Sequence, residues 1–176
     1  MGKDGPAPRD EVDAVVGQWA RVRPDADPAS IGIFGRLGRL HLMERGIVRH
    51  LYEAHGLTAA SFEVLSILRR SGPPHRATAG ALAESALLST GGMTFRIDKL
   101  EREGLVRRVH APEDRRLVLV ELTQAGLSTI DRVYDEHLAL EQQMLGELTP
   151  DERDRLADLL RKLGHSVRRL SAEGGG

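Results

Sequence analysis

The chain has 176 residues, 40% of them hydrophobic and 3% aromatic, with a formal net charge of −1, so aliphatic side chains between helices must supply most of one core. The absence of cysteine excludes disulfides, thiolate metal sites and thiol redox sensing. No apolar stretch approaches the roughly 18 residues that span a bilayer and no signal-peptide core opens the chain, so we expect a soluble, cytoplasmic protein without a membrane partner.

The two ends differ in composition from the rest. Residues 1–9 and 171–176 are rich in glycine, proline or small polar residues, and we expect both to be disordered. Apolar residues then recur at spacings of three and four, which predicts a first helix that Pro24 helps to end. These residues are Val12, Val15, Val16 and Trp19.

A second helix is predicted from about Ser30 to His55. Within it, Gly32, Gly35 and Gly38 recur every three residues and leave a smooth strip. Such a strip favours the close approach of another helix, and lining a cavity is the alternative.

Two short helices follow a central apolar one. Thr58 can cap the apolar helix, Thr78 a short helix, and Ser89 the next helix, which runs to about Glu103. A tight turn is expected at Leu87 and Leu88, so this segment predicts a helix-turn-helix.

A hairpin and two long helices complete the chain. The hairpin is expected to pair residues 105–110 with 117–122 around the turn PEDRR, residues 112–116. One long helix begins at Thr123 and ends near Leu148, and a capping box with proline at the first helical position opens the last helix at Thr149.

These elements predict a mainly α fold with a small β-hairpin: a winged helix-turn-helix lobe, residues 58–123, with long helices before and after it. The slight basic excess of the chain lies in the middle part.

The helix after Ser89 is the expected DNA reader. Met93, Ile97 and Leu100 share one face, so they should anchor it to the core while the opposite face points outward. Asp114 is expected to brace an arginine of the wing tip, which reaches the minor groove. The residues expected to contact DNA are Ser89, Thr90, Gly91, Thr94, Phe95, Lys99, Arg102, Arg115 and Arg116.

At this point the segment EREGLVRRVHAPEDRRLVLVELTQAG resembles the MarR family of winged helix-turn-helix transcription factors, over roughly residues 57–170. The resemblance implies a homodimer whose first and last helices interlock and which binds a pseudo-palindromic operator in double-stranded DNA. It implies that residues 1–57 supply an extra helix, which covers a ligand pocket, and the first long dimerisation helix, 58–123 the DNA-binding lobe, and 124–176 the C-terminal dimerisation helices with the tail. Half-sites about 10 base pairs apart are then expected. Phe95 departs from the family, since many relatives carry an arginine or another polar residue there.

The N-terminal helix with Trp19 resembles that of the urate-responsive branch, in which such a helix closes a small-molecule pocket. The resemblance places the branch's ligand residues on Trp19, Glu63, Arg96 and Arg107, with glutamate where the branch has aspartate. The longer acid leaves two ligand classes open: urate, or another small anionic metabolite such as a citrate- or aconitate-like acid. A further alternative is that Glu63 and Arg96 only pair with each other and that Trp19 belongs to the core.

Helix geometry gives an expectation for Arg96 that does not depend on the family resemblance. At 100° per residue it lies about 60° from the centre of the core-facing side, so it should be half-buried and in need of an anion. Ligand bound there would act on the DNA-reading helix and, by reciprocity, weaken DNA binding by roughly 1–3 kcal/mol. We therefore expect a ligand-released repressor, associated with the nucleoid when bound to DNA.

Other classes are less favoured. No nucleophile elbow, phosphate loop or metalloprotease motif is present, so an enzyme is not expected, and no cofactor is expected either. The spacing of His41, His50, His55 and His137 matches no compact metal-ligand set. A winged-helix module that binds protein instead of DNA remains the alternative, and it would lack a steep salt dependence.

Overall fold

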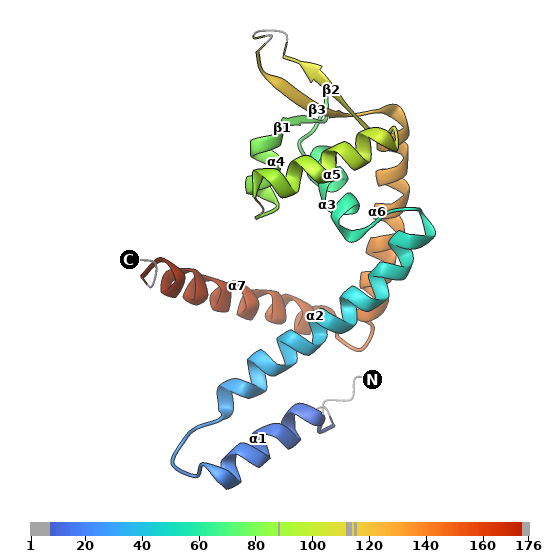
Figure 1. Cartoon of the computed structure of the whole chain (residues 1–176). Coiled ribbons are helices and arrows are strands. Elements are labelled where there is room, and N and C mark those ends of the chain that lie inside the picture. The colour runs from blue at the N-terminus through green and yellow to red at the C-terminus, as the bar shows by residue number, and fades with distance from the viewer. Residues whose placement is uncertain (1–7, 88, 112–113, 115, 174–176) are drawn as a thin grey trace. The chain divides into compact units, whose positions relative to one another are not determined.

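The computed structural model describes residues 8–87, 89–111, 114 and 116–173. Two compact units divide the chain, one covering Arg9–Leu138 and the other including Ala139–Gly176. None of the helices formed by the described residues has the length and apolar character needed to cross a membrane. In chain order the elements are α1 (Glu11–Val22), α2 (Ala29–Ala54), α3 (Ala59–Arg70), β1 (Arg76–Thr78), α4 (Ala79–Ser85), α5 (Thr90–Arg102), β2 (Val106–His110), β3 (Val118–Leu122), α6 (Gln124–Met144) and α7 (Pro150–Glu173), as labelled in Figure 1.

The helix starts predicted from cap residues are confirmed. The hydroxyl of Thr58 accepts the N–H of Ser61 at the start of α3, and the hydroxyl of Thr78 accepts the N–H of Ala81 at the start of α4, both at 3.1 Å. Each bond satisfies one of the amides that a first helical turn leaves unpaired. The local sequence therefore sets where the helices of the lobe begin.

The sheet has one more strand than the predicted hairpin. β2 and β3 pair antiparallel as expected, with Val106 opposite Leu122 and His110 opposite Val118. β1, which the sequence analysis missed, pairs with the other edge of β3, so the order is β1-β3-β2. A strand of three residues is too short to show a two-residue alternation, which explains the omission.

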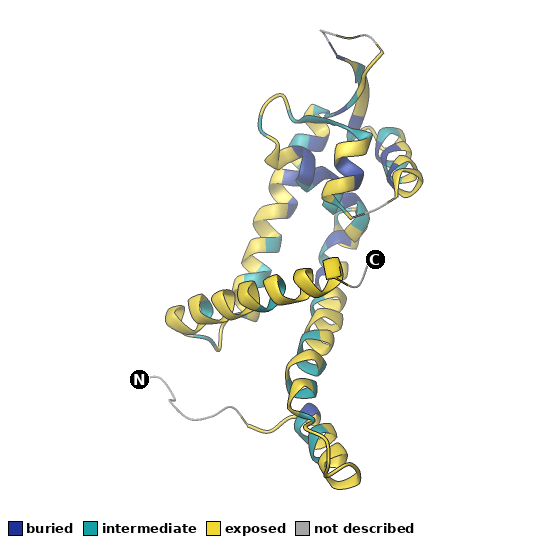
Figure 2. Ribbon diagram, turned by 90° about the vertical axis from the view of Figure 1, so that its left-hand side faces the viewer, coloured by how far each residue is buried: buried dark blue, intermediate teal, exposed yellow. Residues whose placement is uncertain are grey.

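The core lies in the lobe formed by α3, α4, α5, the first half of α6 and the sheet. Figure 2 shows its dark blue buried positions gathered there. Gly126, at the start of α6, touches the hairpin so closely that an added Cβ would lie 1.9 Å from the carbonyl oxygen of Leu105. The fully buried side chains are Val64, Leu65, Leu68, Leu82, Met93, Ile97, Leu100, Val106, Val120, Ile130 and Val133.

α1 packs against the first part of α2 at a glycine. An added Cβ on Gly35 would lie 3.2 Å from Cγ1 of Val12, which is buried. This contact agrees with the close packing that the glycine repeat predicted. Gly38 shows no such contact, because no atom lies within 4 Å of its added Cβ.

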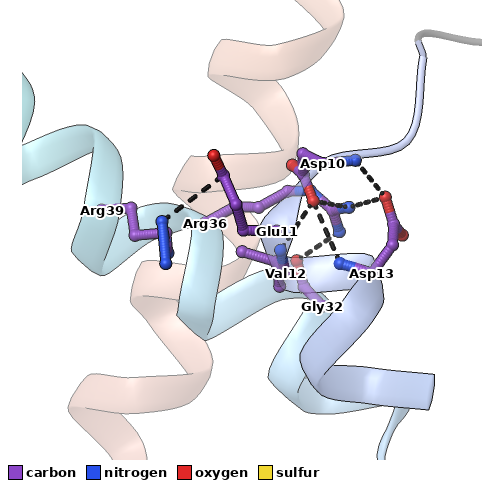
Figure 3. Close-up of polar contacts among 7 residues, drawn as sticks. All are labelled: Asp10, Glu11, Val12, Asp13, Gly32, Arg36 and Arg39. Carbon is purple, nitrogen blue, oxygen red and sulfur yellow. Dashed lines mark hydrogen bonds and ion pairs between the residues drawn. The ribbon is translucent and has the colours of Figure 1, made fainter. Parts of the chain in front are cut away.

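An arginine clamp fastens the same two helices (Figure 3). The guanidinium of Arg36 donates to both carboxylate oxygens of Asp10 at 2.9 Å and lies 2.8 Å from Asp13. The hydrogen bond from Arg36 is the main cause that lowers the pKa of Asp10, whereas the backbone N–H of Asp10 is the main cause for Asp13. Asp10 is also the N-cap of α1, so one residue both starts the helix and attaches it to α2.

α7 begins as predicted but extends further. Oε2 of Glu152 accepts the N–H of Thr149 at 2.8 Å, and the N–H of Glu152 donates to the Thr149 hydroxyl, which confirms the capping box. Residues 171–173, expected to be part of a disordered end, are helical. The expected disorder at 1–7 and 174–176 lies outside the described residues.

Candidate nucleic-acid interface and adjoining cavity

The DNA-reading helix, α5, presents the two faces predicted from its sequence. Met93, Ile97 and Leu100 are buried, at 0%, 1% and 0% exposure, and fix the inner face to the core. The outer residues Gly91, Thr94, Phe95, Asp98 and Arg102 are all exposed. α5 therefore has one solvent-exposed face, opposite the face that packs against the core of the lobe.

The first turn of α5 combines a satisfied cap with open backbone. Oγ of Ser89 accepts the N–H of Gly92 at 3.3 Å, and the hydroxyl of Thr94 donates to the carbonyl of Thr90 at 3.0 Å. A Cβ added to Gly91 would meet no side chain of the described residues within 4 Å. The positive end of the helix is thus accessible to a phosphate or a base edge.

Two basic side chains lie near the end of α5. Nζ of Lys99 lies 3.7 Å from Glu103, and Nε of Arg102 donates to the carbonyl of Asp98 at 3.3 Å. Lys99 is half-buried, whereas Arg102 is exposed. Both side chains are held by contacts with α5 or its C-cap. Because these contacts are weak, either side chain can leave its partner and bind a phosphate instead.

Arg108 on β2 is a residue that the sequence analysis missed. Its guanidinium pairs with Asp98 at 2.5 Å and with Glu101, and its N–H donates to Glu101 at 3.0 Å. The hydrogen bond with Asp98 is the main cause that raises the pKa of Arg108. The two carboxylates lie three residues apart on one helix face, a spacing that signals a shared cation, but it does not show which strand supplies it.

The wing is described only in part. Oδ1 of Asp114 accepts the backbone N–H of Arg116 at 2.9 Å, so the aspartate braces the backbone of the turn. Arg116 is exposed. Arg115, also expected to contact DNA, lies outside the described residues, as do Pro112 and Glu113.

Glu63 and Arg96 form an ion pair, which is one of the two alternatives that the sequence left open. Nη1 of Arg96 donates to Oε2 of Glu63 at 2.6 Å, with the arginine side chain 24% exposed and the glutamate side chain 44% exposed. The half-buried position expected for Arg96 is confirmed. The pair joins the DNA-reading helix α5 to α3.

The same pair lines a cavity of about 620 Å³ between α2, α3 and α5. One wall is aromatic, since the rings of Tyr52 and Phe62 stack with centroids 4.5 Å apart. The lining residues are His41, Glu44, Arg45, Val48, Tyr52, Ala59, Ala60, Phe62, Glu63, Ser66, Ile67, Arg70, Ser85 and Arg96.

Two further arginines at this cavity escaped the sequence analysis. Among the described residues, no hydrogen bond or ion pair engages the guanidinium of Arg45 or Arg70. The hydroxyl of Ser66, on the same wall, is buried without a partner in the described structure. Unpaired cations beside a buried hydroxyl suit an anionic ligand. Arg45 and Arg70 come from different helices, so no local pattern reveals that they share one cavity.

Two of the four predicted ligand residues lie elsewhere. Trp19 is 49% exposed and lines a separate hollow between α1 and α2, with Arg23 and Asp27 among its neighbours. Arg107, on β2, pairs with Glu121 of β3 at 2.5 Å. Within one chain, therefore, Glu63 and Arg96 come together, but Trp19 and Arg107 do not join them.

The histidines form contacts between helices. Nδ1 of His137 lies 3.2 Å from the hydroxyl of Tyr52, and Nε2 of His55 lies 2.8 Å from Glu136. Within the described residues, no three side chains of metal-ligating type come together. These histidines tie α6 to the end of α2.

A helix-turn-helix followed by an antiparallel hairpin, on a three-stranded sheet, defines a winged helix-turn-helix protein. The sequence profile of the MarR family matches residues 57–118. The chain is also 32% identical over 150 residues to the HTH-type transcriptional regulator PecS of Dickeya dadantii, covering 85% of this chain and 90% of PecS. The chain therefore belongs to the MarR family of DNA-binding transcriptional regulators.

Solved structures agree with this assignment. A mutant of E. coli MarR complexed with operator DNA superposes with a TM-score of 0.65 at 26% identity, covering 82% of this chain and 96% of that one. Bordetella bronchiseptica BpsR, whose DNA binding is regulated by 6-hydroxynicotinic acid, gives a TM-score of 0.64 at 28% identity, with coverages of 76% and 98%.

Proposed function

We propose that this protein is a ligand-responsive repressor that binds a pseudo-palindromic operator as a homodimer and is released by a small anionic metabolite. The observation that carries the proposal is the Arg96–Glu63 pair. Both residues line the cavity, and Arg96 is also part of the DNA-reading helix α5. A ligand that draws Arg96 away from Glu63 acts directly on α5. The similarity to BpsR, a protein regulated by an aromatic acid, supports the same mode of control.

The charges of the cavity favour a monoanion. Three arginines and two glutamates line it, Arg45, Arg70, Arg96, Glu44 and Glu63, so its net charge is +1 with His41 neutral. A urate monoanion balances this charge, whereas a citrate-like trianion leaves an excess of two negative charges. The aromatic wall of Tyr52 and Phe62 also suits a flat ring. Urate is therefore our first candidate, and a citrate- or aconitate-like acid is the alternative.

Trp19 and Arg107 have a different place in this proposal. We propose that Trp19 belongs to the cover formed by residues 1–57 and reaches a ligand only through a change in the α1 position or from a second copy. Arg107 would need to leave Glu121 before binding an anion. The core of the site is then Arg45, Arg70 and Arg96.

The dimer is supported by uncovered apolar faces. α7 has no buried residue, and its leucines and valine lie on one side of an amphipathic helix. α1 and α2 expose further large apolar side chains. Burying such faces against a second copy is the usual resolution. The exposed residues on α7 are Leu156, Leu159, Leu160, Val167 and Leu170.

Fluorescence anisotropy on operator DNA tests the whole proposal. The probe is a labelled duplex selected from a random library by the protein, measured against a scrambled duplex at several salt concentrations. We expect tight, sequence-dependent binding that falls steeply with salt and is reversed by urate. Release by citrate alone would replace urate with the alternative ligand class. Equal binding to both duplexes with a flat salt response would favour the protein-interaction module.

A further inference from the structure

The outer face of α5 carries one large apolar side chain, the ring of Phe95, which is 69% exposed. The fold does not need this ring, because Met93, Ile97 and Leu100 already fill the inner face. An exposed phenylalanine on the helix that reads DNA therefore calls for a binding role. Its role rests on the proposed function, in which α5 is the DNA-reading helix and, as in helix-turn-helix proteins generally, would enter the major groove.

Polar groups beside Phe95 are engaged within α5. The Thr94 hydroxyl gives its hydrogen to the carbonyl of Thr90, at 3.0 Å. The Ser89 oxygen accepts the N–H of Gly92. Each hydroxyl therefore has one of its hydrogen-bonding functions already used within the helix: Thr94 keeps only an acceptor, and Ser89 keeps its O–H.

In the following turn, the carboxylate of Asp98 is held by Arg108. Arg102 lies at the C-terminal end of α5, away from the centre of the outer face, where its Nε makes a weak local contact with the carbonyl of Asp98. Arg96 points to the cavity side, where it pairs with Glu63. The ring of Phe95 is therefore the most available group at the centre of the outer face.

Space next to the ring allows a base to approach. Gly91 lies one turn before Phe95 on the same face, and a Cβ added to it would meet none of the described side chains within 4 Å. A bulky residue at this position would stand between the ring and the floor of the groove. With glycine, the ring and the bare first turn form one continuous surface.

In the major groove the one apolar group on a base edge is the C5-methyl of thymine. We infer that Phe95 is a specificity-determining residue that recognises a thymine methyl in each half-site. Phenylalanine cannot form the paired hydrogen bonds by which arginine selects guanine, so an apolar contact with a thymine methyl is the base readout open to this side chain.

The test compares two duplexes that differ only in the thymine methyl groups of one half-site. One is the duplex selected from a random library, and the other has deoxyuridine in place of every thymine of one half-site. For the native protein we expect about fourfold weaker binding per lost contact, which corresponds to one buried methyl group. For Phe95→Ala we expect equal affinity for the two duplexes.

Two controls separate this loss from other effects. Lys99→Gln should weaken binding to both duplexes by the same factor, because a phosphate contact does not depend on the base. Any change in duplex shape caused by deoxyuridine would persist in Phe95→Ala. Circular dichroism confirms the fold of each variant.

Three results would overturn the inference. If the native protein binds both duplexes equally while still preferring its selected sequence, the thymine contact is wrong and the proposed function stands. If Phe95→Ala keeps the full preference for thymine, another residue reads the methyl. If the protein selects no sequence at all, both the inference and the proposed function fail.

Discussion

Arg108 of strand β2 joins Asp98 of the DNA-reading helix, with Nη2 2.5 Å from Oδ1. The same guanidinium also pairs with Glu101. Arg108 thus links the wing to α5 and neutralises two carboxylates that would otherwise repel phosphates. This one residue therefore affects both the orientation of α5 and the charge of that helix.

Replacing Arg108 by alanine should weaken DNA binding by about tenfold or more, because two negative charges are left uncompensated on the helix. Anisotropy on the selected duplex measures the loss. Adding Asp98→Asn and Glu101→Gln to the alanine variant should restore most of the affinity, since the repulsion is removed. If the triple variant binds as poorly as Arg108→Ala, neutralisation is not the role of this arginine.

Two glycines should respond in opposite directions. Gly126→Ala forces a Cβ against the carbonyl of Leu105 and should lower the free energy of unfolding by at least about 2 kcal/mol. Gly91→Ala meets no atom and should raise it by about 0.5–1 kcal/mol, because alanine favours the helix. Urea denaturation followed by circular dichroism measures both. A stabilised Gly91→Ala protein with weakened DNA binding would support close approach of DNA to this turn.

Local rules predicted the helices well, and the reason is physical. Caps such as Thr58, Thr78 and Ser89 act through hydrogen bonds within three residues, so the sequence contains all the information they need. β1 and Arg108 were missed because each depends on a partner from another part of the chain. Thr78 was identified as a cap, yet its place opposite Leu119 follows from the tertiary fold alone.

The candidate site divides in the same way. The half-buried position of Arg96 followed from helix geometry, and its link to Glu63 followed from the need of each charge for a partner. Arg45 and Arg70 are brought together by the packing of α2 against α3, which no spacing within either helix reveals. Trp19 was placed by resemblance, and the position of α1 determines where it lies.

If the cavity holds the anion, a variant of one of its arginines should lose affinity for the ligand and keep its affinity for DNA. Arg70→Gln should reduce the affinity for urate by about 10- to 100-fold, because a charge-assisted contact with the anion is removed. Affinity for DNA without ligand should stay unchanged. Arg69→Gln is the matched control, since the neighbouring Arg69 is already paired with Asp131 at 2.6 Å. Equal urate responses in the two variants would remove Arg70 from the proposed site.

The α1 clamp predicts a transition in acid. The pKa of Asp10 is lowered by the hydrogen bond from Arg36. The stabilisation that the clamp gives to the α1–α2 contact is therefore fully present above the ordinary carboxyl pKa of 3.8, and it is lost as the pH falls through the lowered pKa. The attachment of α1 to α2 should therefore weaken only below pH 3.8, as the pH falls through the lowered pKa of Asp10. The single tryptophan, Trp19, lies on α1 and reports this by its emission.

Variants of the clamp identify its source. Arg36→Gln should show separated-helix emission already at neutral pH. Arg39→Gln is the control, because Arg39 makes a longer contact of 3.4 Å with Glu11 and leaves the Arg36 bonds intact. An acid transition that is the same in Arg36→Gln and the native protein would show that other groups control α1.

Assembly through α7 gives the last prediction. Leu160→Asn places an amide on the apolar face of a helix that has no buried residue within its own chain, so only association with a second copy should suffer. Sedimentation should shift toward the monomer, and operator affinity should fall at least tenfold, because a monomer contacts one half-site. Arg155→Asn makes the same change to an exposed polar position and should leave both measurements unchanged. A different result would contradict this. If Leu160→Asn lowers the free energy of unfolding but leaves the mass from sedimentation unchanged, the leucine face of α7 packs within one chain. The proposed dimer must then use another surface.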